Sequence, residues 1–91
     1  MYQLKFTEKA DEGVRRLKKT GDVQVLKKLA VLLSELTIHP TYGTGKPERL
    51  KGNLSGKWSR RINDRHRLIY EIFEQIVTVE IIQVYGHYSE S

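Results

Sequence analysis

The sequence predicts an α+β fold with an N-terminal strand, an antiparallel two-helix hairpin and then an antiparallel sheet. Apolar residues recur at helical spacing before residue 40, and β-rich runs dominate from Trp58 onward. Helices and strands that are segregated along a chain are typical of α+β architecture, with the helices packed on one face of the sheet. The 91 residues suit a single domain, residues 1–91.

The first half of the chain is expected to form a strand and two helices. Residues 2–6 alternate between apolar and polar side chains, as in a short strand. Thr7 can cap a helix that begins at Glu8, because its hydroxyl can accept a backbone N–H of the first turn. Gly21 is a natural C-terminal stop, and Asp22 can cap the next helix at once. Such a short link predicts an antiparallel helical hairpin.

The second helix has the clearest pattern, with apolar residues at helical spacing from residue 26 to residue 36. His39-Pro40 is expected to end it, because a residue before proline is pushed out of the helical backbone region. The next segment, residues 41–57, is rich in loop-forming residues, and residues 48–51 are expected to be extended. Its glycines do not have the spacing of a nucleotide-binding loop, so turn formation explains them better.

Three β-rich runs are expected to form an antiparallel meander, at residues 58–63, 67–73 and 77–84. The first turn decides where two arginines point. An odd number of turn residues after Asn63 would pair Asn63 with Arg67 and place Arg61 and Arg67 on one face of the sheet. An even number would place these arginines on opposite faces.

Positive charge is concentrated in residues 46–67. The chain has 16 Lys and Arg residues against 11 Asp and Glu residues, a net charge of +5. Residues 46–67 contain eight basic and two acidic residues, a net charge of +6, and the rest of the chain has a net charge of −1. A local cationic segment suggests a polyanionic partner, foremost a nucleic acid. A solvated basic face or an acidic protein partner is the alternative.

Composition excludes several classes of protein. Without cysteine, the chain has neither a disulfide framework nor a thiolate metal site. The three histidines, at positions 39, 66 and 87, lack the spacing of a zinc pair, so no metal or other cofactor is expected. No apolar run approaches the ~20 residues of a membrane span, and the N-terminus does not resemble a signal peptide. A cytoplasmic protein without membrane association is therefore expected.

Two side chains could carry acid–base chemistry. Glu48 lies within the cationic segment, where a residue meant only to hold phosphate would not be acidic. His87 follows the last predicted strand, and histidine is the most frequent proton donor or acceptor in catalysis. A local ion pair of Glu48 and a merely exposed His87 are the alternatives.

A carboxylate, arginines and a histidine in a basic groove would suffice for RNA cleavage without a metal ion. A general base takes the proton of the ribose 2′-OH, and the resulting oxygen attacks the adjacent phosphorus. Arginine stabilises the charge that develops on the phosphoryl oxygens. A general acid then protonates the 5′-oxygen that leaves.

The chain resembles the YoeB/Txe toxins, within the wider RelE-like group, over essentially its whole length and most specifically in its second half. The resemblance is carried by GKPERLKGNLSGKWSRRI at residues 45–62, HRLIY at residues 66–70 and GHY at residues 86–88. It implies a microbial-ribonuclease-like α+β fold and a toxin of a bacterial type II toxin–antitoxin pair. Such toxins enter the ribosomal A site and cut mRNA there. It also implies a YefM-like antitoxin, a homodimer, and binding of operator DNA only as the toxin–antitoxin complex.

The resemblance assigns roles to individual residues. Glu48 matches the general base, His87 the general acid, Arg67 the arginine at the scissile phosphate, and Tyr88 the tyrosine at the active site. Basic residues of the cationic segment are expected to bind RNA phosphates: Lys46, Lys51, Arg61 and Arg65. The resemblance also predicts that Arg61 and Arg67 share a face.

The C-terminus departs from the family pattern. In the best-known members the tyrosine that matches Tyr88 is the last residue, whereas here Ser89-Glu90-Ser91 follows it. The extension displaces the terminal carboxylate and adds the charge of Glu90. Two other functions remain open from sequence: a non-catalytic module that binds RNA or the ribosome, and a module that only binds an antitoxin. Formation of a cleavage product separates both from a nuclease.

Overall fold

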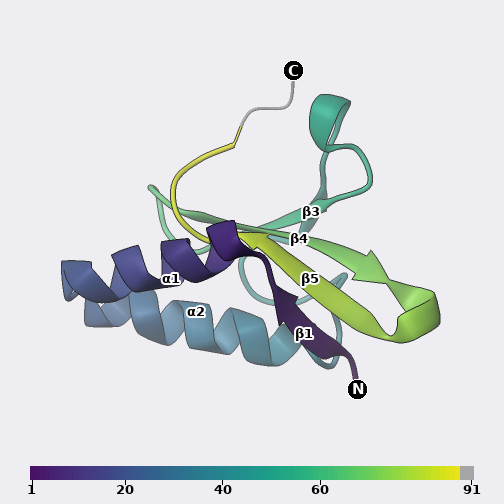
Figure 1. Cartoon of the computed structure of the whole chain (residues 1–91), viewed down its shortest axis with the longest axis horizontal. Helices are drawn as coiled ribbons and strands as arrows, with labels where there is room; N and C mark the ends of the chain where they lie inside the picture. Colours follow the sequence, from purple (N-terminus) through teal and green to yellow (C-terminus); the bar gives the residue numbers. More distant parts are fainter. Residues whose placement is uncertain (89–91) are drawn as a thin grey trace.

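The computed structural model describes residues 1–88, so the predicted effect of Ser89-Glu90-Ser91 lies outside the described residues. The elements are β1 (Gln3–Phe6), α1 (Glu8–Thr20), α2 (Val23–Leu36), β2 (Glu48–Arg49), β3 (Trp58–Arg61), β4 (Arg67–Phe73) and β5 (Thr78–Gln83), with short 3₁₀ turns η1 (Gly52–Leu54) and η2 (Glu74–Ile76). Figure 1 shows the two antiparallel helices on one side of the sheet. The α+β fold and the order of its elements are confirmed.

The five strands form one sheet in the order β1-β5-β4-β3-β2. Strands β2 to β5 are antiparallel neighbours, which confirms the meander predicted for β3, β4 and β5. The sheet is nevertheless mixed, because β1 pairs in parallel with β5, with Leu4 opposite Val79. Tight turns dictate the direction of strands that follow one another closely. They have no influence on β1, whose direction relative to β5 depends on the path of the chain through both helices.

The helix ends follow the predicted chemistry. The Thr7 hydroxyl accepts the Ala10 N–H at 3.1 Å, and Asp22 Oδ1 accepts the Gln24 N–H at 3.1 Å. Gly21 closes α1 in the left-handed region, with φ 71°. Helix α2 ends at Leu36, earlier than expected from His39-Pro40. The chain leaves the helix through a tightened turn, in which the Thr37 and Ile38 N–H groups donate to carbonyls three residues back.

The hydrophobic core lies between the two helices and the sheet. It contains residues of α1 and α2 together with inward-facing residues of β4 and β5: Ala10, Leu17, Val25, Leu29, Leu32, Leu36, Leu68, Tyr70, Val79 and Ile81. One charged side chain, Arg60 of β3, is also fully buried. Neither α1 nor α2 covers the opposite face of the sheet (Figure 1), and we call it the open face.

The hairpin between β3 and β4 confirms that Arg61 and Arg67 share a face. The two arginines are direct cross-strand partners. The predicted pairing of Asn63 with Arg67 is wrong by two positions, because Asn63 belongs to the turn. Its side-chain oxygen accepts the backbone N–H groups of Arg65 at 2.9 Å and His66 at 2.8 Å. This Asx-type turn leaves residues 62–66, an odd number, outside the strands.

No helix within residues 1–88 is long and apolar enough to cross a membrane.

Candidate active site on the open face

A pocket of about 220 Å³ opens on the open face where β2, β3 and β4 meet. It is lined by Lys46, Glu48, Ser59, Arg61 and Arg67. Strand pairing brings these residues together, because Glu48 is opposite Ser59 and Arg61 is opposite Arg67. Ser59 and Arg61 are two residues apart in β3 and therefore point to the same face. The pocket thus combines a carboxylate, a hydroxyl and three cations.

The chain before β2 is held tightly against β3. The Arg61 N–H donates to the Gly45 carbonyl at 2.6 Å. Gly45 has φ 85°, and a Cβ there would lie 2.9 Å from the Arg61 carbonyl oxygen, so only glycine fits this approach. Lys46 follows with φ 51°, in the left-handed region that a lysine rarely adopts. These contacts place Lys46 at the wall of the pocket.

The C-terminal segment crosses the open face and reaches the pocket. The Tyr88 hydroxyl donates to Glu48 Oε1 at 3.1 Å and lies 3.3 Å from Ser59 Oγ. Behind Tyr88, the Gln83 amide donates to the Tyr85 carbonyl at 3.2 Å and the His87 carbonyl at 2.9 Å. Tyr88 therefore joins Glu48, although forty residues separate them in sequence.

Residue His66 anchors the same segment from the side. Its Nδ1 accepts the Gly86 N–H at 2.9 Å, while the Arg67 N–H donates to the Gly86 carbonyl at 3.0 Å. Burial lowers the pKa of His66, and the charges of Arg65 and His87 lower it further. The neutral imidazole is the form that can accept a hydrogen bond at Nδ1. His66 is thus held in the state that supports the C-terminal segment.

The two arginines of the pocket differ in how firmly they are held. Arg67 is partly buried, and its guanidinium donates to the Asn63 carbonyl at 2.7 Å. The Arg61 side chain is 44% exposed and lies 3.8 Å from Asp64, itself almost fully exposed. Arg67 is therefore oriented before any ligand binds, whereas Arg61 can adjust to one.

Four predicted site residues are not part of the wall of this pocket, and of these only Tyr88 reaches it, through its hydrogen bond to Glu48. The His87 side chain is exposed, and Lys51 is exposed immediately before η1. Arg65 lines a different hollow of about 500 Å³, together with Asp22 and His66. Of the eight predicted residues, the structure brings together Lys46, Glu48, Arg61, Arg67 and Tyr88.

Sequence reasoning missed three residues of the site: Ser59, His66 and Gln83. Ser59 could have been found from strand alternation, because it precedes Arg61 by two positions. His66 and Gln83 act on backbone groups of the C-terminal segment, and no local sequence signal indicates such contacts. Their roles depend on how that segment folds back over the sheet.

The side chains of the pocket have the charge and the geometry to hold a phosphate. Within residues 1–88, no group of three or more His, Asp or Glu side chains is placed to hold a metal. Arginine forks match the geometry of phosphoryl oxygens, and lysine adds a further charge. A carboxylate beside them can accept a proton from a bound hydroxyl. The arrangement can therefore bind a phosphodiester and remove a proton next to it.

The sequence of this chain is similar to that of known bacterial toxins. The family model described as "YoeB-like toxin of bacterial type II toxin-antitoxin system" matches residues 6–88, which include every residue of the site. The chain is 47% identical over 69 residues to "Toxin YoeB" of Streptomyces coelicolor, covering 75% of this chain and 79% of that relative.

Solved structures show the same similarity over almost the whole chain. The "YoeB/ParE toxin from Agrobacterium tumefaciens" superposes with a TM-score of 0.87 at 34% identity, covering 94% of this chain and 99% of that one. A heterotetrameric YoeB-YefM complex and a YoeB dimer, both from Staphylococcus aureus, contain chains with TM-scores of 0.80 and 0.81. Both are 34% identical to this chain. The alignment with the complex covers 97% of this chain and 99% of that one, and the alignment with the dimer covers 96% and 98%.

Proposed function

Because this chain belongs to the YoeB-like toxins of bacterial type II toxin–antitoxin systems, we propose that it is an endoribonuclease. It cuts mRNA in the A site of the ribosome and thereby inhibits translation. The reaction is general acid–base catalysis with attack by the ribose 2′-OH, and it needs no metal ion. The observation that carries this proposal is the pocket that combines Glu48 with Lys46, Arg61 and Arg67.

Glu48 is the general base of the proposed reaction. Its Oε1 accepts the Tyr88 hydroxyl at 3.1 Å, which orients the carboxylate. We assign Oε2 to the ribose 2′-OH, whose proton it removes as the oxygen attacks phosphorus. Tyr88 is then a positioning group for the base, and it also presents an aromatic ring near the bound RNA.

Arg67 stabilises the phosphoryl oxygens as negative charge develops on them. Its bond to the Asn63 carbonyl fixes its direction, so little reorganisation is needed in the transition state. Arg61 and Lys46 hold the same phosphate from the pocket wall. Lys51 and Arg65, which lie outside this wall, are assigned to neighbouring phosphates of the RNA.

His87 is the general acid, which gives a proton to the leaving 5′-oxygen. Its exposed side chain is adjacent in sequence to Tyr88, and its carbonyl is held by Gln83 at 2.9 Å. Because the backbone of His87 is held in place, its imidazole can move only by changing rotamer. A histidine can both donate and recover a proton near neutral pH, which suits repeated turnover.

The proposed partners follow from the family. A YefM-like antitoxin neutralises the toxin, and the Staphylococcus aureus complex and dimer support both this partner and a homodimer. The ribosome and mRNA are the targets, so the site of action is the cytoplasm. Operator DNA is bound only as the toxin–antitoxin complex.

Primer extension on mRNA-programmed ribosomes tests the function. Wild type is expected to cut within the A-site codon, and Glu48→Gln is expected to cut at least ~100-fold more slowly, the usual contribution of a general base. Glu8→Gln, at the exposed start of α1, is the matched control and should cut like wild type. Equal cutting by Glu48→Gln would exclude Glu48 as the base. No cutting by ribosome-bound wild type would identify a non-catalytic binding module.

A further inference from the structure

We propose that Arg60 is a positioning residue that sets Lys46 and Glu48 in the pocket by holding the loop between α2 and β2. This inference rests on the proposed function of the same pocket. Arg60 is fully buried and does not line the pocket, since its side chain points to the helix face of the sheet. The side chain of the next residue, Arg61, points to the open face and lines the pocket.

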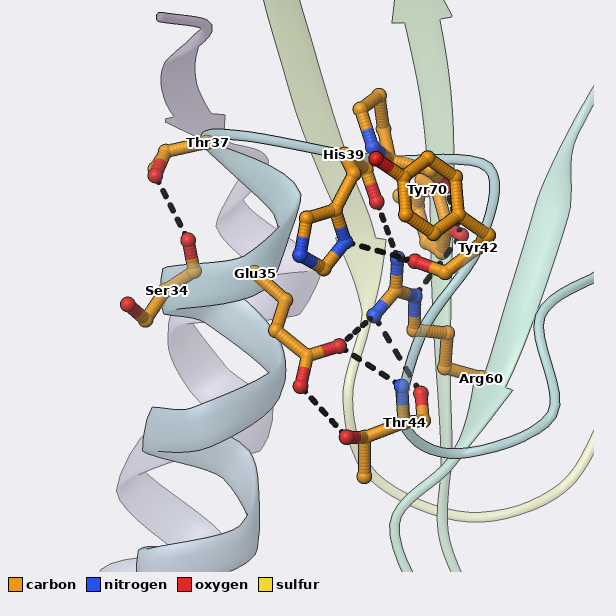
Figure 2. Close-up of polar contacts among 9 residues, drawn as sticks. Ser34, Glu35, Thr37, His39, Tyr42, Thr44, Arg60 and Tyr70 are labelled. Atoms are coloured by element: carbon orange, nitrogen blue, oxygen red, sulfur yellow. Dashed lines mark hydrogen bonds and ion pairs between the residues drawn. The ribbon is translucent and has the colours of Figure 1, made fainter.

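The Arg60 guanidinium donates hydrogen bonds to several carbonyl groups of the loop (Figure 2). One terminal nitrogen donates to the His39 carbonyl at 2.7 Å and the Tyr42 carbonyl at 2.8 Å. The other donates to the Thr44 carbonyl at 3.3 Å. Three carbonyls of residues 39–44 thus converge on one side chain, which needs the planar fork of arginine.

Tyr70 of β4 binds both Arg60 and the loop from the side of the core. Its hydroxyl accepts the Arg60 Nε–H at 3.2 Å and donates to the Pro40 carbonyl at 2.7 Å. Burial raises the pKa of Tyr70, so the phenol stays protonated and keeps this donor. A fourth carbonyl of the loop is therefore tied to the same cluster.

Glu35 of α2 supplies the countercharge (Figure 2). Its Oε1 lies 2.7 Å from Arg60 and accepts the Thr44 N–H at 2.8 Å. Its Oε2 accepts the Thr44 hydroxyl at 2.5 Å. Partial burial opposes ionisation, but the hydrogen bonds from Thr44 and Arg60 outweigh it and lower the pKa of Glu35. A Cβ at Gly43 would lie 2.3 Å from Oε1, so this glycine is needed for the close approach.

Stability of the fold alone does not explain why a buried arginine, with Glu35 and Tyr70 bonded to it, stands at this position. A buried ion pair must repay the cost of removing both charges from water, and apolar residues of similar size often serve a core as well. Arg60 is opposite Leu68 in the strand register, among apolar core residues. What an apolar side chain could not do is bind the loop carbonyls. The arrangement therefore points to the loop as the reason for an arginine here.

The loop held by Arg60 leads directly into the pocket. Thr44 is followed by Gly45, whose carbonyl accepts the Arg61 N–H, and by Lys46 in its left-handed conformation. A non-glycine residue stays in that region only when its surroundings enforce it. Glu48 comes two residues later. Release of the loop would thus shift Lys46 and Glu48 relative to Arg67, and a shift of about 1 Å can cost ~100-fold in rate.

Trp58 offers a readout of loop position that does not depend on catalysis. It is the only tryptophan of the chain. Its strand partner is Arg49, the residue after Glu48, and the Arg49 guanidinium lies 5.7 Å from the centre of its ring. Movement of β2 would therefore change the emission of Trp58.

The test is Arg60→Lys, which keeps the charge but not the fork. We expect kcat on programmed ribosomes to fall about 100-fold with KM changed less than about threefold, because the chemistry is misaligned while the phosphate-binding arginines remain. Trp58 emission should shift, and far-ultraviolet circular dichroism should stay that of the folded protein. The matched control is Arg15→Lys, whose exposed ion pair with Glu12 lies on α1 and should leave kcat within about twofold.

Wild-type kcat and unshifted Trp58 emission in folded Arg60→Lys would overturn the proposal. If this variant does not fold, Glu35→Gln takes its place, with a fall in kcat per folded molecule expected and an unchanged value overturning the proposal. If wild type itself does not cut RNA, the proposed function fails separately. An unshifted Trp58 emission would then still refute the positioning role.

Discussion

Adjacent arginines in β3 have opposite environments and opposite tasks. Arg60 is fully buried and binds backbone carbonyls, whereas the Arg61 side chain is 44% exposed and lines the pocket. Strand alternation is the cause, since successive side chains point to opposite faces of a sheet. Arg60 therefore contacts the core while the next residue, Arg61, lines the pocket.

His66 makes the support of the C-terminal segment dependent on pH. It is 9% exposed, and its Nδ1 holds the Gly86 N–H next to His87. Its pKa is lowered chiefly by burial, then by Arg65 and His87, and Asp22 opposes these effects. Between this lowered pKa and the ordinary value of 6.5, the unfolded chain binds more protons than the folded chain. The contribution of His66 to stability is therefore complete above about pH 6.5 and declines as the pH falls below it.

We predict that the thermal stability of wild type relative to His66→Gln decreases from pH 7.5 to pH 5.5. Glutamine can accept the Gly86 N–H but does not titrate, so other ionisable groups largely cancel in the comparison. Melting temperatures from circular dichroism measure the difference. A difference that stays constant over this range, or grows as the pH falls, would contradict the assignment.

Helix α1 supports the C-terminal segment as well as the core. The Thr7 hydroxyl caps α1 and also donates to the Ile82 carbonyl of β5 at 3.0 Å. Gly13 packs so closely on the chain after β5 that a Cβ there would lie 2.7 Å from Val84 Cγ2. At the scale of elements, the start and middle of α1 thus fix where β5 ends and where the segment toward Tyr88 begins.

We predict that Thr7→Ala lowers the free energy of unfolding by about 1–2 kcal/mol, because it removes both the cap and the bond to β5. For a domain of this size the loss is a decrease of about 5–10 °C in melting temperature. Thr7→Ser keeps the hydroxyl and should lose less than about 0.5 kcal/mol. Equal losses in urea unfolding of the two variants would assign the effect to the threonine methyl group instead.

The two faces of the sheet differ in what they carry. Helices and core residues cover one side of the sheet, and the pocket occupies the other. Away from the pocket the open face carries charges of both signs, with Lys5 opposite Glu80, Glu80 opposite Glu71, and Lys57 paired with Glu71 at 3.7 Å. The excess positive charge therefore acts at the end of the face where β2, β3 and β4 meet.

We predict that binding of a short single-stranded RNA weakens steeply with salt and that Arg61→Gln makes this dependence shallower. Loss of one phosphate contact should reduce the slope of log affinity against log salt by about 0.7. Fluorescence anisotropy between 50 mM and 300 mM salt would measure it. Lys5→Gln is the control, because Lys5 is opposite Glu80 at the far edge of the sheet. An equal change of slope in both variants would indicate diffuse attraction and no phosphate contact at Arg61.

Local patterns predicted most of the elements. The caps at Thr7 and Asp22 and the stop at Gly21 depend on residues close in sequence, and all three are confirmed. The local pattern leaves open whether Arg61 and Arg67 share a face, whereas the family resemblance predicts the shared face, and it is also confirmed. The direction of β1 could not be predicted from local patterns, because β1 pairs in parallel with β5, which is distant in sequence. The β3–β4 register was predicted two residues away from the one observed, because the Asn63 side chain closes the turn by accepting the N–H groups of Arg65 and His66.

Charge and periodicity, which are properties of short stretches, were enough to predict the fold class, the position of the cationic segment and Glu48 as a candidate base. The family resemblance added Arg61 and Arg67 as site candidates. Three features became visible only in the folded chain: the contact of Tyr88 with Glu48, the support of the C-terminal segment by His66 and Gln83, and the binding of the loop by Arg60. These contacts join residues brought close by folding, and backbone carbonyls that bind a buried arginine leave no trace in residue type.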